Sequence, residues 1–316
     1  MITAVVLTNR RLWSPTSMLL LSLVAYDAVF LLASIPISVT GLFIKRDPMT
    51  FTTILGVFYP LRYMAHMGSI YTTVTVTVER FLVVLVPLKA RIFCTFGKTR
   101  KILLGVFAFS VAFNIPRCFF QPLFRATDPP TTAAAPNDQS AYYFWLYFRV
   151  YELYMSGVLF YLLPYALIPI LNLQLLLAIK KRRSETRMMQ VKNEHQPNYP
   201  RSTDLEDGVT MIVLGITACF FICCLIPAIY TMTQVAEMPD TNVFASFLII
   251  ASDTMLCINA STDFFFYCLL GRKFRNIFIR LFCPKRYIQK SRTMTSLNHS
   301  YYRHNRANSE TCYHSV

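Results

Sequence analysis

Charged side chains are scarce in this sequence: Asp, Glu, Lys and Arg make up 15% of the 316 residues, whereas apolar residues make up 54%. The mean hydropathy is positive, at +0.42. No ordinary soluble domain of this length needs such a composition, so it excludes that class. We therefore expect an all-α protein that crosses a membrane several times.

Acidic residues are the scarcer of the charged types, with 16 Asp and Glu against 31 Lys and Arg. In a soluble protein the resulting net charge of +15 would suggest a nucleic-acid partner. Here 24 of the basic residues fall in four segments outside the apolar stretches: around 10–11, 89–101, 180–201 and from 272 onward. Basic residues accumulate on the cytoplasmic side of membranes. We expect these segments, including the C-terminus, to lie inside the plasma membrane against anionic lipid, with no nucleic acid bound.

Several motifs are absent. No internal repeat is visible, which disfavours a transporter built from inverted halves. Neither a Cys/His spacing for a metal nor a nucleophile-and-base motif is found, so we expect no enzyme and no transition-metal site. Cys118 is the one cysteine near the expected outer face, so no outer-loop disulfide can be drawn.

Six apolar stretches reach the length of about 20 residues that a membrane-spanning helix requires. They are 16–44, 52–86, 102–121, 142–179, 208–235 and 243–270. Residues 2–8 have the composition of the last turns of another span, and no signal peptide is recognisable. We expect a seven-helix bundle whose first helix is largely missing; a six-helix protein with a short inner start is the alternative. The membrane domain would cover 1–283, and 284–316 would form a disordered cytoplasmic tail.

Polar residues inside these stretches are candidates for function, because an ionisable group at the bilayer centre costs roughly 2.5–3.5 kcal/mol. Asp27 falls near the middle of the first complete span, and Ser69 lies at a comparable depth. Asn259 and Asp263 are one turn apart on the last span and can face them. This set would suit a sodium ion with water, or two acids sharing a proton. Separate hydrogen bonds to the backbone are the simpler alternative.

Glu79 and Arg80 end a long apolar run, just before Pro87 and a basic loop. A lone arginine there could merely extend to the membrane surface, but the adjacent glutamate makes a specific role more plausible. Farther along, Pro227 lies inside the fifth complete span. Proline removes a backbone hydrogen bond and kinks a helix, so we predict a hinge at this position.

A second charged group is expected near the outer face. Arg62 lies five helical turns from Arg80 on the same side of the helix, and a cation there disfavours an amine ligand. His66 is one turn deeper. The other members, near outer helix ends, are Arg117, Glu152 and Asp253. Together they predict a mixed-charge mouth suited to a peptide, although each residue could instead be structural.

Taken together, these features resemble the rhodopsin-like (class A) G protein-coupled receptors, and within them the receptors for FMRFamide-like and related invertebrate neuropeptides. The resemblance runs from Met1 to about Cys283. The segments that carry it are LTNRRLWSPTSMLLLSLVAYD, YPLRYMAHMGSIYTTVTVTVERF, FSVAFNIPR, EDGVTMIVLGITACFFICCLIP and NASTDFFFYCLLGRKFR. It implies a receptor that binds an amidated neuropeptide outside the cell and activates a heterotrimeric G protein inside.

The resemblance also assigns roles. Glu79–Arg80–Phe81 stands for the family's Asp-Arg-Tyr switch, and Asp263 to Tyr267 for its Asn-Pro-x-x-Tyr. At rest, Glu79 and Asp207 would restrain Arg80, although Asp207 could equally favour its own helix N-terminus through the helix dipole. Agonist binding would swing the Pro227 helix outward and free Arg80 for the G protein, with Tyr267 moving inward in support.

Beyond Tyr267, the stretch LLGRKFRNIFIRLFC (269–283) places basic residues between apolar ones, which predicts an amphipathic helix along the inner membrane surface. Cys283 at its end is a candidate palmitoylation site. Serines and threonines in the tail could recruit arrestin after phosphorylation.

Five positions depart from the family pattern: Leu55 at the place of the disulfide cysteine, Phe107, Asn172, Leu225 and Phe264. The missing disulfide would leave the outer loop less restrained. Two alternatives stay open: a truncated receptor fragment that cannot signal, and an ion-coupled transporter using Asp27 and Asp263.

Overall fold

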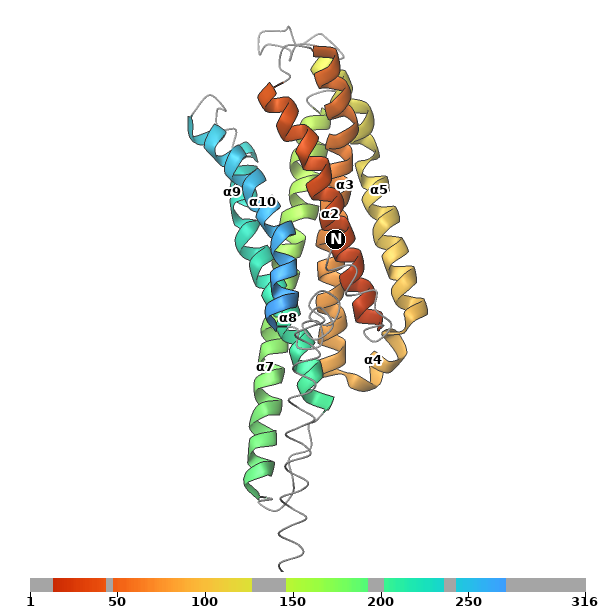
Figure 1. The fold of residues 1–316 in the computed structure, drawn as a ribbon, viewed down its shortest axis with the longest axis vertical. Helices are drawn as coiled ribbons and strands as arrows, with labels where there is room; N and C mark the ends of the chain where they lie inside the picture. Colours follow the sequence, from red (N-terminus) through yellow and green to blue (C-terminus); the bar gives the residue numbers. More distant parts are fainter. Residues whose placement is uncertain (1–13, 44–47, 127–145, 193–201, 236–242, 271–316) are drawn as a thin grey trace, which may run out of the picture.

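The computed structural model describes residues 14–43, 48–126, 146–192, 202–235 and 243–270. Within these ranges the regular structure is helical, and the helices run side by side in an elongated bundle (Figure 1). The elements are α2 (Pro15–Phe43), α3 (Pro48–Leu85), α4 (Pro87–Phe93), α5 (Phe96–Ala126), η2 (Tyr147–Met155), η3 (Gly157–Leu162), α7 (Leu163–Lys192), α8 (Ser202–Cys223), α9 (Leu225–Val235) and α10 (Val243–Leu270).

The expected all-helical membrane fold is confirmed. Five helical stretches are long and apolar enough to cross a membrane: Pro15–Val39, Thr53–Leu85, Phe96–Phe119, Arg149–Lys181 and Thr210–Gln234. A shorter apolar stretch, Phe247–Thr262, corresponds to the sixth predicted span. The predicted helix stub at 2–8 and the tail lie outside the described residues, as does the predicted amphipathic stretch at 269–283 from residue 271 onward, with Cys283 at its end.

Two prolines coincide with breaks between helices. Pro87 begins α4 directly after the end of α3. Farther along, α8 ends at Cys223 and α9 begins at Leu225, two residues before Pro227. In a continuous α-helix the N–H group of residue 227 would donate to the carbonyl of Cys223. Proline has no N–H group, so this hydrogen bond is lost. The interruption agrees with the kink predicted from Pro227.

The fourth membrane-spanning stretch, Arg149–Lys181, differs from a simple α-helix. Its first part, η2 and η3, is wound as π-helix, and only the remainder, α7, is α-helical. A π-helix bonds residue i to i+5 and is rare beyond a single turn. The change to α-helix coincides with Pro164, which is buried in the first turn of α7.

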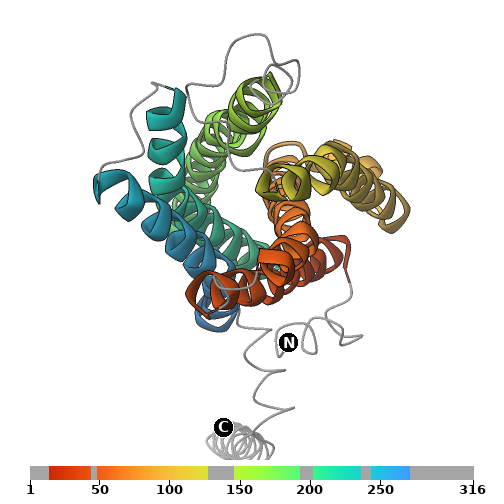
Figure 2. The ribbon, with the colours of Figure 1, turned by 90° about the horizontal axis from the view of Figure 1, so that it is seen from above.

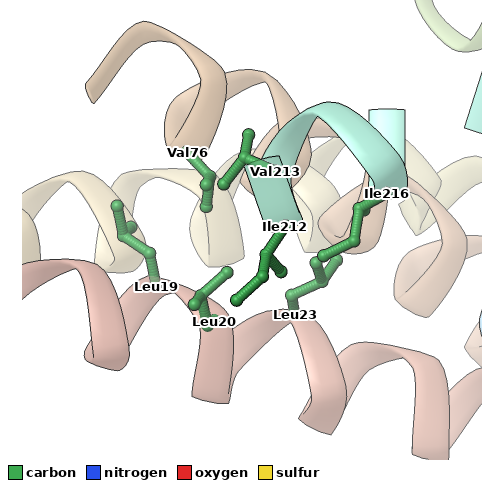
Figure 3. Close-up of a cluster of buried hydrophobic side chains, with 7 residues drawn as sticks. All are labelled: Leu19, Leu20, Leu23, Val76, Ile212, Val213 and Ile216. Atoms are coloured by element: carbon green, nitrogen blue, oxygen red, sulfur yellow. The ribbon is translucent and has the colours of Figure 1, made fainter. Parts of the chain in front are cut away.

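One buried apolar cluster of the bundle core lies where α2, α3 and α8 meet. Its buried members are Leu19, Leu20, Leu23, Val76, Ile212, Val213 and Ile216, whose side chains point toward one another in Figure 3. In the view of Figure 2, α5 stands at the edge of the bundle beside α3. Much of the apolar surface of α5 is exposed, as expected for a helix that faces lipid.

Close packing of α2 on α3 depends on Gly68. A Cβ atom at this position would overlap the aromatic ring of Tyr26, so a larger residue could not be accommodated without a shift of that ring. Because Gly68 precedes Ser69, the close approach also brings Ser69 next to α2.

Candidate functional site

Helix α3 carries buried polar residues along most of its length. Arg62, His66 and Ser69 lie in its first two thirds, and Glu79 and Arg80 lie near its end. We call the two ends of the bundle the Arg62 end and the Arg80 end. The Arg80 end is the one next to α4 in Figure 1.

At the Arg80 end, Thr16 of α2 joins Glu79 and Arg80 into one buried cluster. The Arg80 Nη2 atom lies 3.5 Å from Glu79 Oε2. The Thr16 hydroxyl donates to Glu79 Oε1 at 3.1 Å and accepts a hydrogen bond from Arg80 Nη2. Both charges are therefore neutralised locally, which a charge buried in a helical bundle requires. Sequence reasoning missed Thr16, which follows Ser14 and Pro15 and so had only the features of a helix start.

Other predicted switch residues have side chains outside the described part of the structure. Asp207 falls in α8, and Asp263 and Tyr267 fall in α10, but the placement of their side chains is not described. Pro227 is buried in α9, one turn after the break at Cys224. The roles of Asp207, Asp263 and Tyr267 in restraining or supporting Arg80 therefore stay predictions.

Midway along the bundle, Ser69 contacts Asp27. The Ser69 hydroxyl donates to Asp27 Oδ1 at 2.7 Å, and both residues are buried. Asn259 is half-buried on α10. These oxygen donors suit a hard cation such as sodium. Since Asp263 is outside the described side chains, the predicted sodium site stays a prediction.

The first ion pair at the Arg62 end joins α3 to α10. Arg62 Nη2 lies 2.6 Å from Asp253 Oδ1, and the two side chains differ sharply in exposure, 8% for Arg62 and 55% for Asp253. The guanidinium also lies 5.0 Å from the centre of the Phe30 ring. Asp253 is thus held at one oxygen by a buried cation while the rest of its carboxylate is open.

The second ion pair joins α5 to η2 and is enclosed. Arg117, whose side chain is 0% exposed, donates to both carboxylate oxygens of Glu152, from Nε at 3.0 Å and from Nη2 at 2.7 Å. It also donates to Ser156 Oγ at 2.7 Å and to Asn114 Oδ1. The hydroxyl of Tyr147 donates to Glu152 at 2.9 Å. Such two-pronged pairing is the strongest form of Arg–carboxylate contact.

This geometry favours the structural alternative for Arg117 and Glu152. The Arg117 guanidinium lies 4.2 Å from the ring centre of Tyr63 and 5.1 Å from that of Tyr151. Aromatic rings therefore pack against the guanidinium, while its N–H groups are engaged in hydrogen bonds. Among the described residues, Arg117 is fully buried and Glu152 keeps 13% of its side chain exposed with both oxygens paired, so a ligand would have to compete with Arg117 for the carboxylate. The roles of Asn114 and Ser156 were not predicted, because a neutral polar residue in a span gives no sign of its partner.

His66 lies between these two pairs. Its ring is buried and packs on Phe30 and Phe160, with ring centres 5.5 Å away in both cases. Its Nε2 atom is buried and has no hydrogen-bond partner among the described residues. A buried polar atom without a partner is unfavourable and calls for an explanation.

The side chains at four of the five positions that depart from the family pattern are described. Leu55 is buried near the start of α3, and Asn172 donates to Thr217 Oγ1 at 2.6 Å, tying α7 to α8. Phe107 and Leu225 are exposed, as lipid-facing residues are. The described cysteines are free thiols. Phe264 lies outside the described side chains.

Residues 1–268 match the family model of the 7 transmembrane receptor (rhodopsin family). The chain belongs to this family, in agreement with the helical bundle and with the buried polar residues along α3.

Similar proteins include two receptors with related names. The chain is 25% identical to the FMRFamide receptor of Drosophila melanogaster, over 90% of its own length and 51% of that receptor. It is 26% identical to the FMRFamide peptide receptor frpr-18 of Caenorhabditis elegans, over 84% of its length and 61% of that protein. The chain is 23% identical to neuromedin-U receptor 2 of Rattus norvegicus, over 89% of its own length and 70% of that receptor. The chain thus spans about half to three fifths of the length of the two FMRFamide receptors.

Proposed function

We propose that this protein is a plasma-membrane receptor that binds an amidated neuropeptide of the FMRFamide type at the Arg62 end and activates a heterotrimeric G protein at the Arg80 end. The observation that carries the proposal is that one helix, α3, contributes to two ion pairs. The Arg62–Asp253 pair is partly exposed, and the Glu79–Arg80 pair is buried. Arg62 and Arg80 are separated by about 27 Å at the helical rise of 1.5 Å per residue. The distance suits a helix that links events on two sides of a membrane.

The chemistry of the Arg62 end supports a peptide with a cationic residue next to its amidated end. Asp253 keeps carboxylate surface open beside its contact with Arg62. A peptide arginine could therefore bind Asp253 and loosen that contact, because both cations compete for the same carboxylate. The names of two similar proteins, both FMRFamide receptors, support the same class of ligand.

The Arg80 end supports the signalling half of the proposal. The Thr16–Glu79–Arg80 cluster holds Arg80 inside the bundle, and its release would present a cation to a partner. A ligand can drive this change only through a difference in its affinity for the closed and open states. In this scheme α8 and α9 move about the break at Cys224, and the C-terminus is cytoplasmic. Arrestin and inner-leaflet lipid are further partners in the proposal, through residues beyond 270.

The test is to express the chain in cells without endogenous response and measure calcium and cyclic AMP after addition of Phe-Met-Arg-Phe-amide. We expect a saturable response that Asp253→Asn weakens by about tenfold in potency, the equivalent of 1.4 kcal/mol. Asp253→Glu keeps the negative charge and should retain most of the potency. Surface labelling should be similar for all three proteins. Silence from a surface-delivered native chain, across a panel of amidated neuropeptides, would reject the proposed function.

A further inference from the structure

The two ion pairs at the Arg62 end are connected by a row of rings in contact, which we call the His66 stack: Phe30, which is tilted by 42° to the His66 ring, then His66 and Phe160. The Arg62 guanidinium lies 5.0 Å from the centre of the Phe30 ring. The His66 ring centre is 5.5 Å from that of Phe30 and 5.5 Å from that of Phe160, to which it is nearly parallel at 14°. Arg117 lies 5.7 Å from the Phe160 ring centre. A cation therefore caps each end of the row.

The His66 stack joins parts of the protein that are far apart in sequence. Its three rings come from α2, α3 and η3, while the flanking ion pairs attach α10 at one end and α5 with η2 at the other. In Figure 2, α10 and α5 stand on opposite sides of the bundle. The row is thus a physical path of contacts from an open carboxylate, Asp253, to an enclosed one, Glu152.

The two ends of this path differ in how readily they can change. Asp253 is more than half exposed and holds Arg62 through one oxygen, whereas Glu152 binds Arg117 through both oxygens inside the bundle. A ligand can reach only the first pair without unpacking the protein. If Arg62 lost its carboxylate, its charge would depend more on the face of Phe30, because attraction to an aromatic face strengthens when a cation is desolvated.

The central residue is not explained by packing alone. A phenylalanine at position 66 would stack on the same two rings, and it would not leave a buried nitrogen without a hydrogen-bond partner among the described residues. The imidazole is therefore unfavourable for stability in this state, unless another group satisfies Nε2 in a different state. A polar group of a bound peptide would be such a partner.

We propose that the His66 stack couples the two ion pairs, so that a peptide cation that draws Asp253 away from Arg62 shifts η3 through His66. His66 thus has two roles: its ring couples the two ion pairs, and its Nε2 atom binds the peptide through a hydrogen bond. The proposal rests on the proposed function for its ligand, but the coupling itself is a property of the protein without ligand. Spatial proximity alone does not demonstrate coupling, so it has to be measured.

The experiment is a double-mutant cycle between Asp253→Asn, which removes a charge and keeps side-chain shape, and Glu152→Asp, which keeps the charge that Arg117 needs but draws it back by one methylene. The cycle is run in three backgrounds: native, His66→Phe and His66→Leu. Two quantities are measured, the melting temperature of the detergent-solubilised protein without peptide and the potency of Phe-Met-Arg-Phe-amide in cells. Residues without shared partners at this separation normally give additive effects.

In the native background we expect the two substitutions to be non-additive by about fivefold or more in potency, within the range of allosteric coupling. Their melting-temperature shifts should be non-additive as well. His66→Phe, which keeps the rings stacked, should retain both couplings but lower the potency, because Nε2 is lost. His66→Leu, which removes the ring, should make both quantities additive.

Additive effects in the native background would overturn the proposal, and so would coupling that survives His66→Leu. If the native protein reaches the surface but gives no response to the peptide, the proposed function fails. The melting-temperature cycle then still decides whether the His66 stack couples the two pairs, so the two failures are distinguishable.

Discussion

Thr16 and Arg80 are 64 residues apart in the chain, yet the Arg80 guanidinium donates a hydrogen bond to the Thr16 hydroxyl inside the bundle. The same hydroxyl donates to Glu79, the neighbour and ion partner of Arg80. One neutral side chain at the start of α2 therefore holds together the charged pair at the end of α3.

The contact predicts that Thr16→Val raises ligand-independent signalling. Hydrogen bonds to charged groups contribute about 1.5–3 kcal/mol, so their loss should shift a resting-to-active equilibrium by roughly tenfold. The measurement is basal second-messenger production in transfected cells, normalised to surface receptor. Thr16→Ser keeps the hydroxyl and should behave as the native protein does. Equal basal signalling in Thr16→Val and Thr16→Ser would show that this contact does not restrain Arg80.

A second prediction concerns the packing of α2 on α3. Gly68→Ala places a Cβ atom in the ring of Tyr26, and overpacking of this kind costs about 1–3 kcal/mol. We expect a melting temperature several degrees lower, by roughly 2–4 °C per kcal/mol, in the detergent-solubilised protein.

The matched control is Gly105→Ala on α5, where no atom lies within 4 Å of the added Cβ. Because alanine is the better helix former by about 1 kcal/mol, this variant should be as stable as the native protein or more so. The double variant Gly68→Ala/Tyr26→Val should recover part of the loss. If Gly68→Ala has the same melting temperature as Gly105→Ala, the stability of the protein does not depend on the close approach of α2 and α3 at position 68.

The helical spans were predictable because a backbone in hydrocarbon must satisfy its hydrogen bonds within the helix, so long apolar runs become helices regardless of context. The break near Pro227 followed from proline having no N–H group. Which charged residues pair with each other was harder to predict from the sequence. Arg62 and Asp253 were recognisable as charges near helix ends, but their contact spans 191 residues and depends on how α3 and α10 are rotated.

The π-helical winding of η2 and η3 had no recognisable sequence signal. One stabilising contact comes from another helix: the Ser156 hydroxyl accepts a hydrogen bond from Arg117 of α5, while it donates to the carbonyl of Tyr151, five residues earlier in the same stretch. The winding is thus tied to a tertiary contact across residues that are remote in sequence. For the same reason Arg117 and Glu152 could be listed as candidate ligand residues, and only the folded geometry favours an internal pair.

The enclosed pair predicts that Arg117→Lys is not tolerated. A lysine has no planar fork and cannot bind both oxygens of Glu152 while donating to Ser156 and Asn114. Lysine keeps the positive charge but has fewer donors, and each lost hydrogen bond to a charged group contributes about 1.5–3 kcal/mol, so we expect most of the protein to be retained inside the cell. The measurement is the ratio of surface to total receptor by antibody labelling.

Asp253→Asn is the comparison for this experiment, because it breaks an ion pair of which one member is more than half exposed. Asparagine keeps an oxygen that can accept a hydrogen bond from Arg62, and position 253 is open to solvent, so its surface delivery should be closer to native than that of Arg117→Lys. Equal surface delivery of Arg117→Lys and Asp253→Asn would contradict the distinction between an enclosed and an open pair.

The contact of Ser69 with Asp27 leads to a last prediction, on sodium. A buried carboxylate and hydroxyl supply oxygen ligands for a hard cation, and an ion bound only in the resting state would oppose agonist binding. We expect Phe-Met-Arg-Phe-amide to bind more weakly in sodium chloride than in choline chloride of equal ionic strength. Ser69→Ala should reduce this difference, and Asp27→Asn should abolish it, because the asparagine carries no charge. Thr75→Val, which removes a hydroxyl that bonds the backbone of its own helix, should leave the sodium effect intact. A sodium effect that persists in Asp27→Asn would mean that the ion acts at a different place.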